Sequence, residues 1–127
     1  MNVNHPLFML KKLLPQLQER SRRSAIIIVS AAMSYYVVPG YLTYASSKAM
    51  LSNFGMGIAK EVNDPKLDFQ VFNCGSVKTK RNPRGLDSTE DAVHGSLRDL
   101  GIDLVTNGPY ANDYKFEFAV KGANGYS

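Results

Sequence analysis

Tyr44 and Lys48 are the residues whose types and spacing most directly suggest chemistry in this sequence. They stand four residues apart at the start of a predicted helix, so their side chains should share one helical face. An ammonium group beside a phenol favours the phenolate and lowers its pKa. Such a tyrosine can pass a proton at neutral pH, which an unperturbed phenol with a pKa of about 10 does poorly. The pair predicts proton transfer, although two unrelated helical residues show this spacing by chance.

A helix and a buried strand are predicted before this pair in the chain. Leucines at three- and four-residue steps predict a helix over about Pro6–Glu19, which Pro15 should kink or break in its last turn. The apolar, β-branched run Ala25–Ser30 is typical of a strand buried on both faces of a parallel sheet. A loop with the turn dipeptide Pro39–Gly40 follows, and a second helix is predicted over about Thr43–Val62.

The rest of the chain continues the alternation of strands and helices. Leu67–Phe72 is predicted to be a strand, and Ser88–Asp91 resembles a capping box that opens a third helix ending near Gly101. A short strand is expected at Leu104–Thr106, and either a strand or a short helix at Tyr114–Val120. This order indicates α/β layering with right-handed crossovers in a parallel sheet, and 127 residues suit one domain.

Composition excludes several classes of protein. Apolar residues make up 44% of the chain and charged residues 20%, which is typical of a folded domain. The single cysteine, Cys74, excludes an intrachain disulfide and a zinc site built from cysteines. No metal site is expected, because no cluster of ligands surrounds His5 or His94. No apolar run approaches the ~20 residues that span a bilayer, so no transmembrane segment is expected.

The formal net charge of +4 comes largely from two basic clusters. A nucleic-acid binder ranks last among the functions considered, because aromatic residues do not interleave with these clusters. The remaining interpretations are a solvated surface, or a patch that receives a phosphorylated cofactor or a CoA ester. The first cluster is Arg20, Arg22 and Arg23, and the second is Lys78, Lys80, Arg81 and Arg84.

Four stretches, taken in chain order, resemble the short-chain dehydrogenase/reductase family. Asn2-Val3 resembles the family's Asn at the kinked helix before the catalytic strand, and Val29–Ala32 the strand end that carries the catalytic serine. Tyr44–Ala49 matches the family's Tyr-x-x-x-Lys helix opening, and Asn73–Thr79 is similar to its Pro-Gly-x-Val-x-Thr loop. Four matches in the right order are far more specific than any one of them.

A looser resemblance points to one branch of that family. Leu14–Ser21, Val77–Lys80 and Thr106–Tyr110 look like the branch containing very-long-chain 3-oxoacyl-CoA reductases and hydroxysteroid dehydrogenases. The resemblance implies an NAD(P)(H)-dependent oxidoreductase of ketoreductase or alcohol dehydrogenase type, with NADP or NAD as cofactor. It also implies a small carbonyl or alcohol substrate, a homodimer formed through the first two helices, and a cytoplasmic or endoplasmic reticulum-associated location.

The resemblance also assigns roles to single residues. Tyr44 would be the acid in reduction and the base in oxidation, while Lys48 would lower its pKa and hold the nicotinamide ribose hydroxyls. Asn2 would tether a water that connects to the lysine. The nicotinamide end of the cofactor would be lined by Gly75, Val77 and Thr79.

Two departures from the family pattern concern the catalytic serine and the loop proline. The family's serine stands thirteen residues before the tyrosine, and Ala31 occupies that position here. Ser30 is the candidate catalytic serine, although the alternation of a strand directs it to the other face, and Ser34 could substitute if the loop folds differently. A lost donor to the developing oxyanion can cost on the order of 10²–10³ in rate. Cys74 replaces the proline and is expected to be a small buried residue.

A third departure decides the expected fold class. The sequence contains no Gly-rich turn between a strand and a helix, where the family binds the cofactor pyrophosphate. We therefore expect residues 1–127 to form a partial domain: the C-terminal, catalytic half of a Rossmann-type doubly wound parallel sheet, with the N-terminal nucleotide-binding half missing. The strand at Ile26–Val29 would then expose an apolar edge, which promotes association. The alternative function is a catalytically inactive remnant that acts only as a protein-interaction module.

Overall fold

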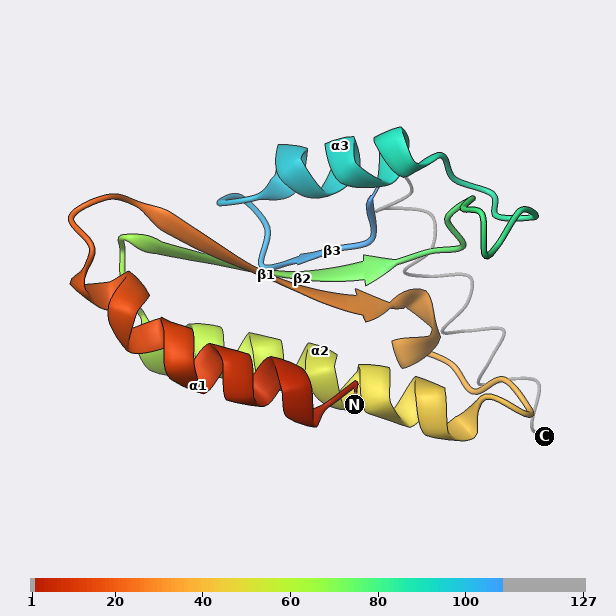
Figure 1. Ribbon diagram of the computed structural model, residues 1–127, viewed down its shortest axis with the longest axis horizontal. Coiled ribbons are helices and arrows are strands. Elements are labelled where there is room, and N and C mark those ends of the chain that lie inside the picture. Colours follow the sequence, from red (N-terminus) through yellow and green to blue (C-terminus); the bar gives the residue numbers. More distant parts are fainter. Residues whose placement is uncertain (1, 109–127) are drawn as a thin grey trace.

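The computed structural model describes residues 2–108, in the predicted order of helices and strands (Figure 1). Each element lies within one or two residues of its predicted span, and the sequence prediction for Tyr114–Val120 falls outside the described residues. The elements are α1 (Asn4–Glu19), β1 (Ser24–Ala31), the 3-10 turn η1 (Ala32–Ser34), α2 (Leu42–Val62), β2 (Leu67–Cys74), α3 (Thr89–Asp99) and β3 (Val105–Thr106).

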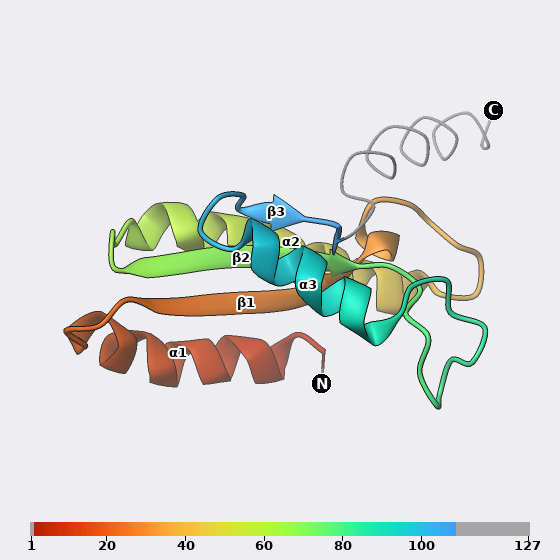
Figure 2. The same ribbon diagram turned by 90° about the horizontal axis from the view of Figure 1, so that it is seen from above.

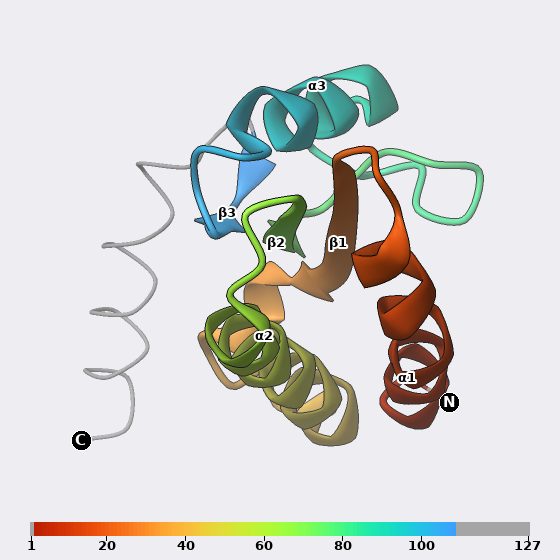
Figure 3. The ribbon, with the colours of Figure 1, turned by 90° about the vertical axis from the view of Figure 1, so that its left-hand side faces the viewer.

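The three strands form a parallel sheet in the order β1-β2-β3. Helices α1 and α2 lie on one face of this sheet, and α3 lies on the other (Figures 1 and 3). The predicted α/β fold with a parallel sheet is confirmed. Since every strand runs in the same direction, the carboxyl ends of β1 and β2 meet at one edge, where the chain turns into η1 and into the loop before α3 (Figure 2).

Helix α2 packs closely against the sheet because it carries a glycine at the point of contact. A Cβ atom on Gly55 would lie 2.6 Å from Cγ2 of Val71 and 2.9 Å from Cδ1 of Ile28. Gly57, two residues further on, would meet no atom within 4 Å. Leu51, one turn before Gly55, is buried. The close approach of α2 to the sheet therefore depends on Gly55 and not on Gly57.

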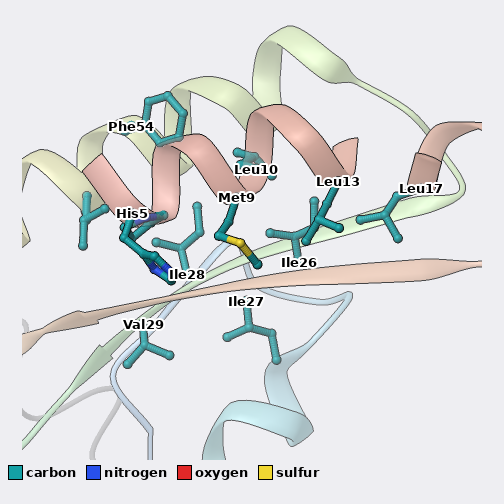
Figure 4. A pocket seen from close by; sticks show the side chains of 12 residues that line it. His5, Met9, Leu10, Leu13, Leu17, Ile26, Ile27, Ile28, Val29 and Phe54 are labelled. Atoms are coloured by element: carbon teal, nitrogen blue, oxygen red, sulfur yellow. The ribbon is translucent and has the colours of Figure 1, made fainter. Parts of the chain in front are cut away.

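Polar contacts connect both ends of the α1 segment to the rest of the chain. Asn2 Nδ2 donates to Ser47 Oγ over 3.3 Å, and Lys66 Nζ donates to the carbonyl of Gln18 over 3.1 Å. Between these contacts an apolar cavity of about 330 Å³ separates the helix from β1 (Figure 4). The helix continues through Pro15 to its predicted end, so the prediction of a possible break at that proline was wrong. The carbonyl that loses its partner belongs to exposed Lys11, where water can bond to it.

The prediction that β1 is buried on both faces was wrong. Ile26 and Ile28 point towards α1, whereas Ile27 and Val29 point to the opposite side (Figure 4). Val29 is 53% exposed and Ile27 37% exposed. β1 is an edge strand in the described part of the chain, where no described element pairs with its outer edge, and its side chains on the face away from α1 are left open to solvent. The expected exposed apolar strand is therefore present.

Helix α3 is tied to the sheet by side-chain hydrogen bonds. Its N-cap is Ser88, whose Oγ accepts from the backbone nitrogen of Asp91 over 3.0 Å, as the capping pattern predicted. Gln70, fully buried in β2, donates through Nε2 to the carbonyl of Ser96 over 2.9 Å. The Ser96 hydroxyl returns a bond to Oε1 of Gln70 over 2.6 Å. These bonds satisfy a polar side chain that would otherwise be costly to bury.

Candidate active site

A cavity of about 820 Å³ opens where the carboxyl ends of β1 and β2 meet the first turn of α2. Its volume lies in the range of small-molecule sites. The cavity lies at the edge of the sheet where β1 ends in η1 and β2 enters the loop before α3. Figure 1 shows this edge of the sheet to the right. Its wall includes Tyr44 and Lys48 from α2, Ser30 and Ala31 from β1, and Cys74 and Gly75 from the end of β2.

The structure brings Tyr44 and Lys48 together on the wall of this cavity. Helix α2 begins at Leu42, so the two residues occupy consecutive turns on one face, as their spacing predicted. The ammonium nitrogen of Lys48 lies 5.8 Å from the centroid of the Tyr44 ring, at cation–π distance. The same nitrogen donates a hydrogen bond to the carbonyl of Val29 over 3.1 Å. This bond anchors the lysine to the end of β1.

The protonation of the pair differs from the sequence prediction. Partial burial raises the pKa of the Tyr44 phenol, and the nearby Cys74 thiol raises it further. Burial lowers the pKa of Lys48, and Cys74 partly opposes that effect. The expected lowering of the Tyr44 pKa by Lys48 is therefore wrong for this structure. The physical reason is that burial of the phenol disfavours the charged phenolate, while the Lys48 ammonium bonds to the Val29 carbonyl.

The hydroxyls that could replace the serine absent at Ala31 already have protein partners. Ser30 is 2% exposed, and its Oγ donates to the carbonyl of Lys48 over 2.8 Å. Its side chain therefore points towards α2. Strand alternation predicted that Ser30 and Ala31 lie on opposite faces of the strand. Ser34 Oγ donates to Oδ1 of Asn73 over 3.2 Å. Each hydroxyl would have to leave a protein hydrogen bond before it could donate to a substrate.

Sequence reasoning missed Asn73 and Ser52, which form a buried polar cluster behind the cavity wall. Ser52 Oγ lies 2.7 Å from Ser30 Oγ and 2.8 Å from Asn73 Oδ1, and its single hydroxyl hydrogen can serve only one of them at a time. Asn73 is 1% exposed, and its amide donates to the Tyr35 hydroxyl. The cluster ties β1, β2, α2 and the turn after β1 together. The available signal was a polar residue directly after an apolar one, Ser52 after Leu51 and Asn73 after Phe72.

The remaining predicted site residues lie in three different places. Asn2 borders a separate hollow of about 430 Å³, which it shares with Tyr44 and Ser47. Gly75 belongs to the wall of the main cavity. Val77 pairs with Asp87 in an isolated bridge, and Thr79 bonds to Asn82 within the loop after β2, so both contribute to the shape of that loop.

Cys74 stands where the family's loop proline is expected. Its thiol is half-buried in the cavity wall, in partial agreement with the prediction of a buried residue. Burial raises the pKa of the thiol, and the carboxylate of Asp87 raises it further, whereas Lys48 lowers it. The neutral thiol is therefore favoured at this position in the cavity wall.

The sequence of this site matches a known family. The model of the short chain dehydrogenase family matches residues 1–88, which include the cavity wall from β1 to the loop after β2. The chain belongs to this family. It is 31% identical over 93 residues to a short chain dehydrogenase of Pseudocercospora fijiensis, covering 73% of this chain and 28% of that protein. It is 27% identical over 100 residues to the very-long-chain 3-oxoacyl-CoA reductase of Schizosaccharomyces pombe, covering 75% and 29% respectively.

Solved structures support the same fold. A structure of a 7beta-hydroxysteroid dehydrogenase superposes with a TM-score of 0.55 at 22% identity, covering 78% of this chain and 40% of that one. A dehydrogenase/reductase from Sinorhizobium meliloti 1021 gives a TM-score of 0.58 at 23% identity, covering 72% and 35%. The chain thus spans less than a third of the length of the two sequence relatives.

Two further observations concern membrane-spanning helices and metal ligands. Within residues 2–108, the structure has no helix with the length and apolar character required to cross a membrane. The same residues contain no group of three or more histidine, cysteine, aspartate or glutamate side chains that could hold a metal ion.

Proposed function

We propose that this chain carries the catalytic half of an NAD(P)(H)-dependent oxidoreductase that reduces a carbonyl or oxidises the matching alcohol. The single observation that carries the proposal is the position of Tyr44 and Lys48 on one cavity wall in a short-chain dehydrogenase. When bound, the nicotinamide cofactor would supply or accept a hydride. The part of the cavity around Lys48 and Gly75 fits its nicotinamide end, because an ammonium donor and a residue without a side chain face the same space.

Each residue would act by position and proton transfer. The Tyr44 hydroxyl would protonate the oxygen of the reduced carbonyl, and it would accept the proton in the reverse direction. Lys48 would donate to the ribose hydroxyls, which requires its ammonium to leave the Val29 carbonyl. In that position the ammonium would also favour the phenolate, offsetting the effect of burial on the Tyr44 pKa. Asn2 supports this arrangement through its bond to Ser47, one residue before the lysine.

The proposed substrates come from the names of similar proteins. The name of one relative, very-long-chain 3-oxoacyl-CoA reductase, makes a 3-oxoacyl thioester the first substrate to test, with a steroid ketone as the second. Exposed apolar residues on α1 and α2, among them Phe8 and Met50, support a homodimer through these two helices.

The experiment is an assay of NADPH oxidation, followed by absorbance, with a 3-oxoacyl-CoA and with a steroid ketone. Tyr44→Phe should lower kcat/KM by about 10²–10⁴-fold, the usual contribution of a general acid. Tyr41→Phe is the matched control, because Tyr41 lines the same cavity and is 55% exposed, and it should stay within about threefold. Equal losses in both variants would contradict the role of Tyr44 as the acid. No turnover by the unmodified chain would favour the alternative of an interaction module without catalysis.

A further inference from the structure

The loop between β2 and α3 is braced by its own hydrogen bonds. The backbone nitrogen of Lys78 donates to the carbonyl of Asp87 over 2.7 Å, and Asn82 Nδ2 donates to the carbonyl of Val77 over 3.0 Å. Asn82 also closes a tight turn with Thr79 through two backbone bonds of 3.1 Å. A Cβ atom on Gly85 would overlap the backbone of Val77 and Lys78, so the two arms of the loop touch. The loop therefore holds a defined shape.

This loop carries a concentrated positive charge. Four cations stand within seven residues, and all four are exposed: Lys78, Lys80, Arg81 and Arg84. The two ion pairs found among residues 2–108, Arg23–Asp68 and Arg98–Asp99, include none of them. The neighbouring acids are Asp87, which is buried at the base of the loop, and Glu90 and Asp91 in the first turn of α3. The braced loop thus presents its cations to solvent.

Both ends of the loop form part of the candidate active site. Ser76 and Leu86 belong to the wall of the 820 Å³ cavity, so the basic segment rises from the rim of that cavity. In Figure 2 the loop projects beyond the carboxyl end of β2. The lining of the cavity also includes the apolar and aromatic residues Met33, Tyr36 and Tyr41. An apolar cavity with a cationic rim suits a ligand that has an apolar body and an anionic head.

We propose that the loop 76–87 is the site for the phosphate-bearing head of the substrate, whose acyl or ring portion enters the cavity beside Tyr44. Arginine binds phosphate oxygens through two parallel N–H donors, and lysine binds them as a point charge. Arg81 and Arg84 therefore provide directed contacts, and Lys78 and Lys80 add attraction. This inference rests on the proposed function and narrows its substrate class to phosphorylated esters such as acyl-CoA thioesters.

The test measures the binding of CoA to the full chain by titration calorimetry, without turnover. Combined substitution Lys80→Gln, Arg81→Gln and Arg84→Gln should weaken binding about tenfold, since an exposed ionic contact contributes about two- to threefold. The matched control is Arg20→Gln with Arg22→Gln, two exposed cations of the other basic cluster, beyond the end of α1. The control should leave CoA affinity unchanged. Affinity of the unmodified chain should also fall as salt rises.

Three results would overturn the proposal. The first is equal CoA affinity in the loop variant and the unmodified chain. The second is equal weakening by the control variant, or equally tight binding of duplex DNA, either of which would indicate non-specific attraction of polyanions. The third is weakened binding of NADPH but not of CoA in the loop variant, which would assign the loop to the phosphate of the cofactor. Because no step requires turnover, CoA binding that depends on the loop in a chain without reductase activity would contradict the proposed function alone.

Discussion

A pair of glycine substitutions in α2 tests the packing that positions Tyr44 and Lys48. Gly57→Ala should stabilise the protein by about 0.8–1.0 kcal/mol, because alanine favours a helix by that amount over glycine and nothing lies within 4 Å of the new methyl group. Gly55→Ala gains the same helix propensity. Its methyl group would, however, lie 2.6 Å from Cγ2 of Val71 and 2.9 Å from Cδ1 of Ile28, which forces the helix or the sheet to move.

The difference between the two variants isolates the packing term, because the propensity gain is common to both. Overpacking a buried site costs about 1–3 kcal/mol, so Gly55→Ala should be less stable than Gly57→Ala by that amount. Urea denaturation followed by circular dichroism measures both free energies of unfolding, and similar slopes would show that the unfolded states are comparable. If Gly55→Ala stabilised the protein as much as Gly57→Ala, the close approach of α2 to β1 and β2 would be refuted.

Three further predictions concern the site and the open edge of the sheet. Ala31→Ser should raise reductase kcat/KM by up to about 10²-fold if the new hydroxyl reaches the oxyanion, and an unchanged rate would show that another group stabilises it. Spectrophotometric titration of the unmodified chain and of Tyr44→Phe should differ by one phenol that ionises above the ordinary tyrosine range, because burial raises the Tyr44 pKa; a transition below that range would contradict this. The unmodified chain should associate as its concentration rises, and Val29→Lys should reduce this association while changing stability by less than about 0.5 kcal/mol. Sedimentation velocity over a range of concentrations measures this association. A monomer with a sharp, concentration-independent melt would contradict the prediction.

The sequence predicted the elements well because their signals are local. An unbroken run of β-branched residues marked β1, and Ser88 with Asp91 marked the start of α3. The burial of β1 was predicted wrongly, because burial depends on which element covers a strand. The exposed faces of Ile27 and Val29 have no local signature, since a strand covered on both sides has the same composition.

The candidate site was predictable where it rests on spacing and not where it rests on long-range contacts. Helical periodicity alone places Tyr44 beside Lys48. The direction of the Tyr44 pKa was predicted wrongly because it depends on the burial of the phenol and on Cys74, thirty residues away in sequence, and helical spacing shows neither. The role of Asn73 could not be read from the sequence, because its partners come from two segments far away along the chain, the turn after β1 and helix α2.

The half-buried thiol of Cys74 makes the candidate site observable without any catalytic assay. It is the one cysteine of the sequence, so a thiol reagent labels a single position, and that position belongs to the cavity wall. The neutral thiol reacts slowly, because burial raises its pKa and the thiolate is the nucleophile. A molecule that fills the cavity should slow the labelling further, whereas one that binds elsewhere should leave it unchanged. The chain thus carries its own reporter of occupancy, through which cofactors and substrates can be screened by mass spectrometry.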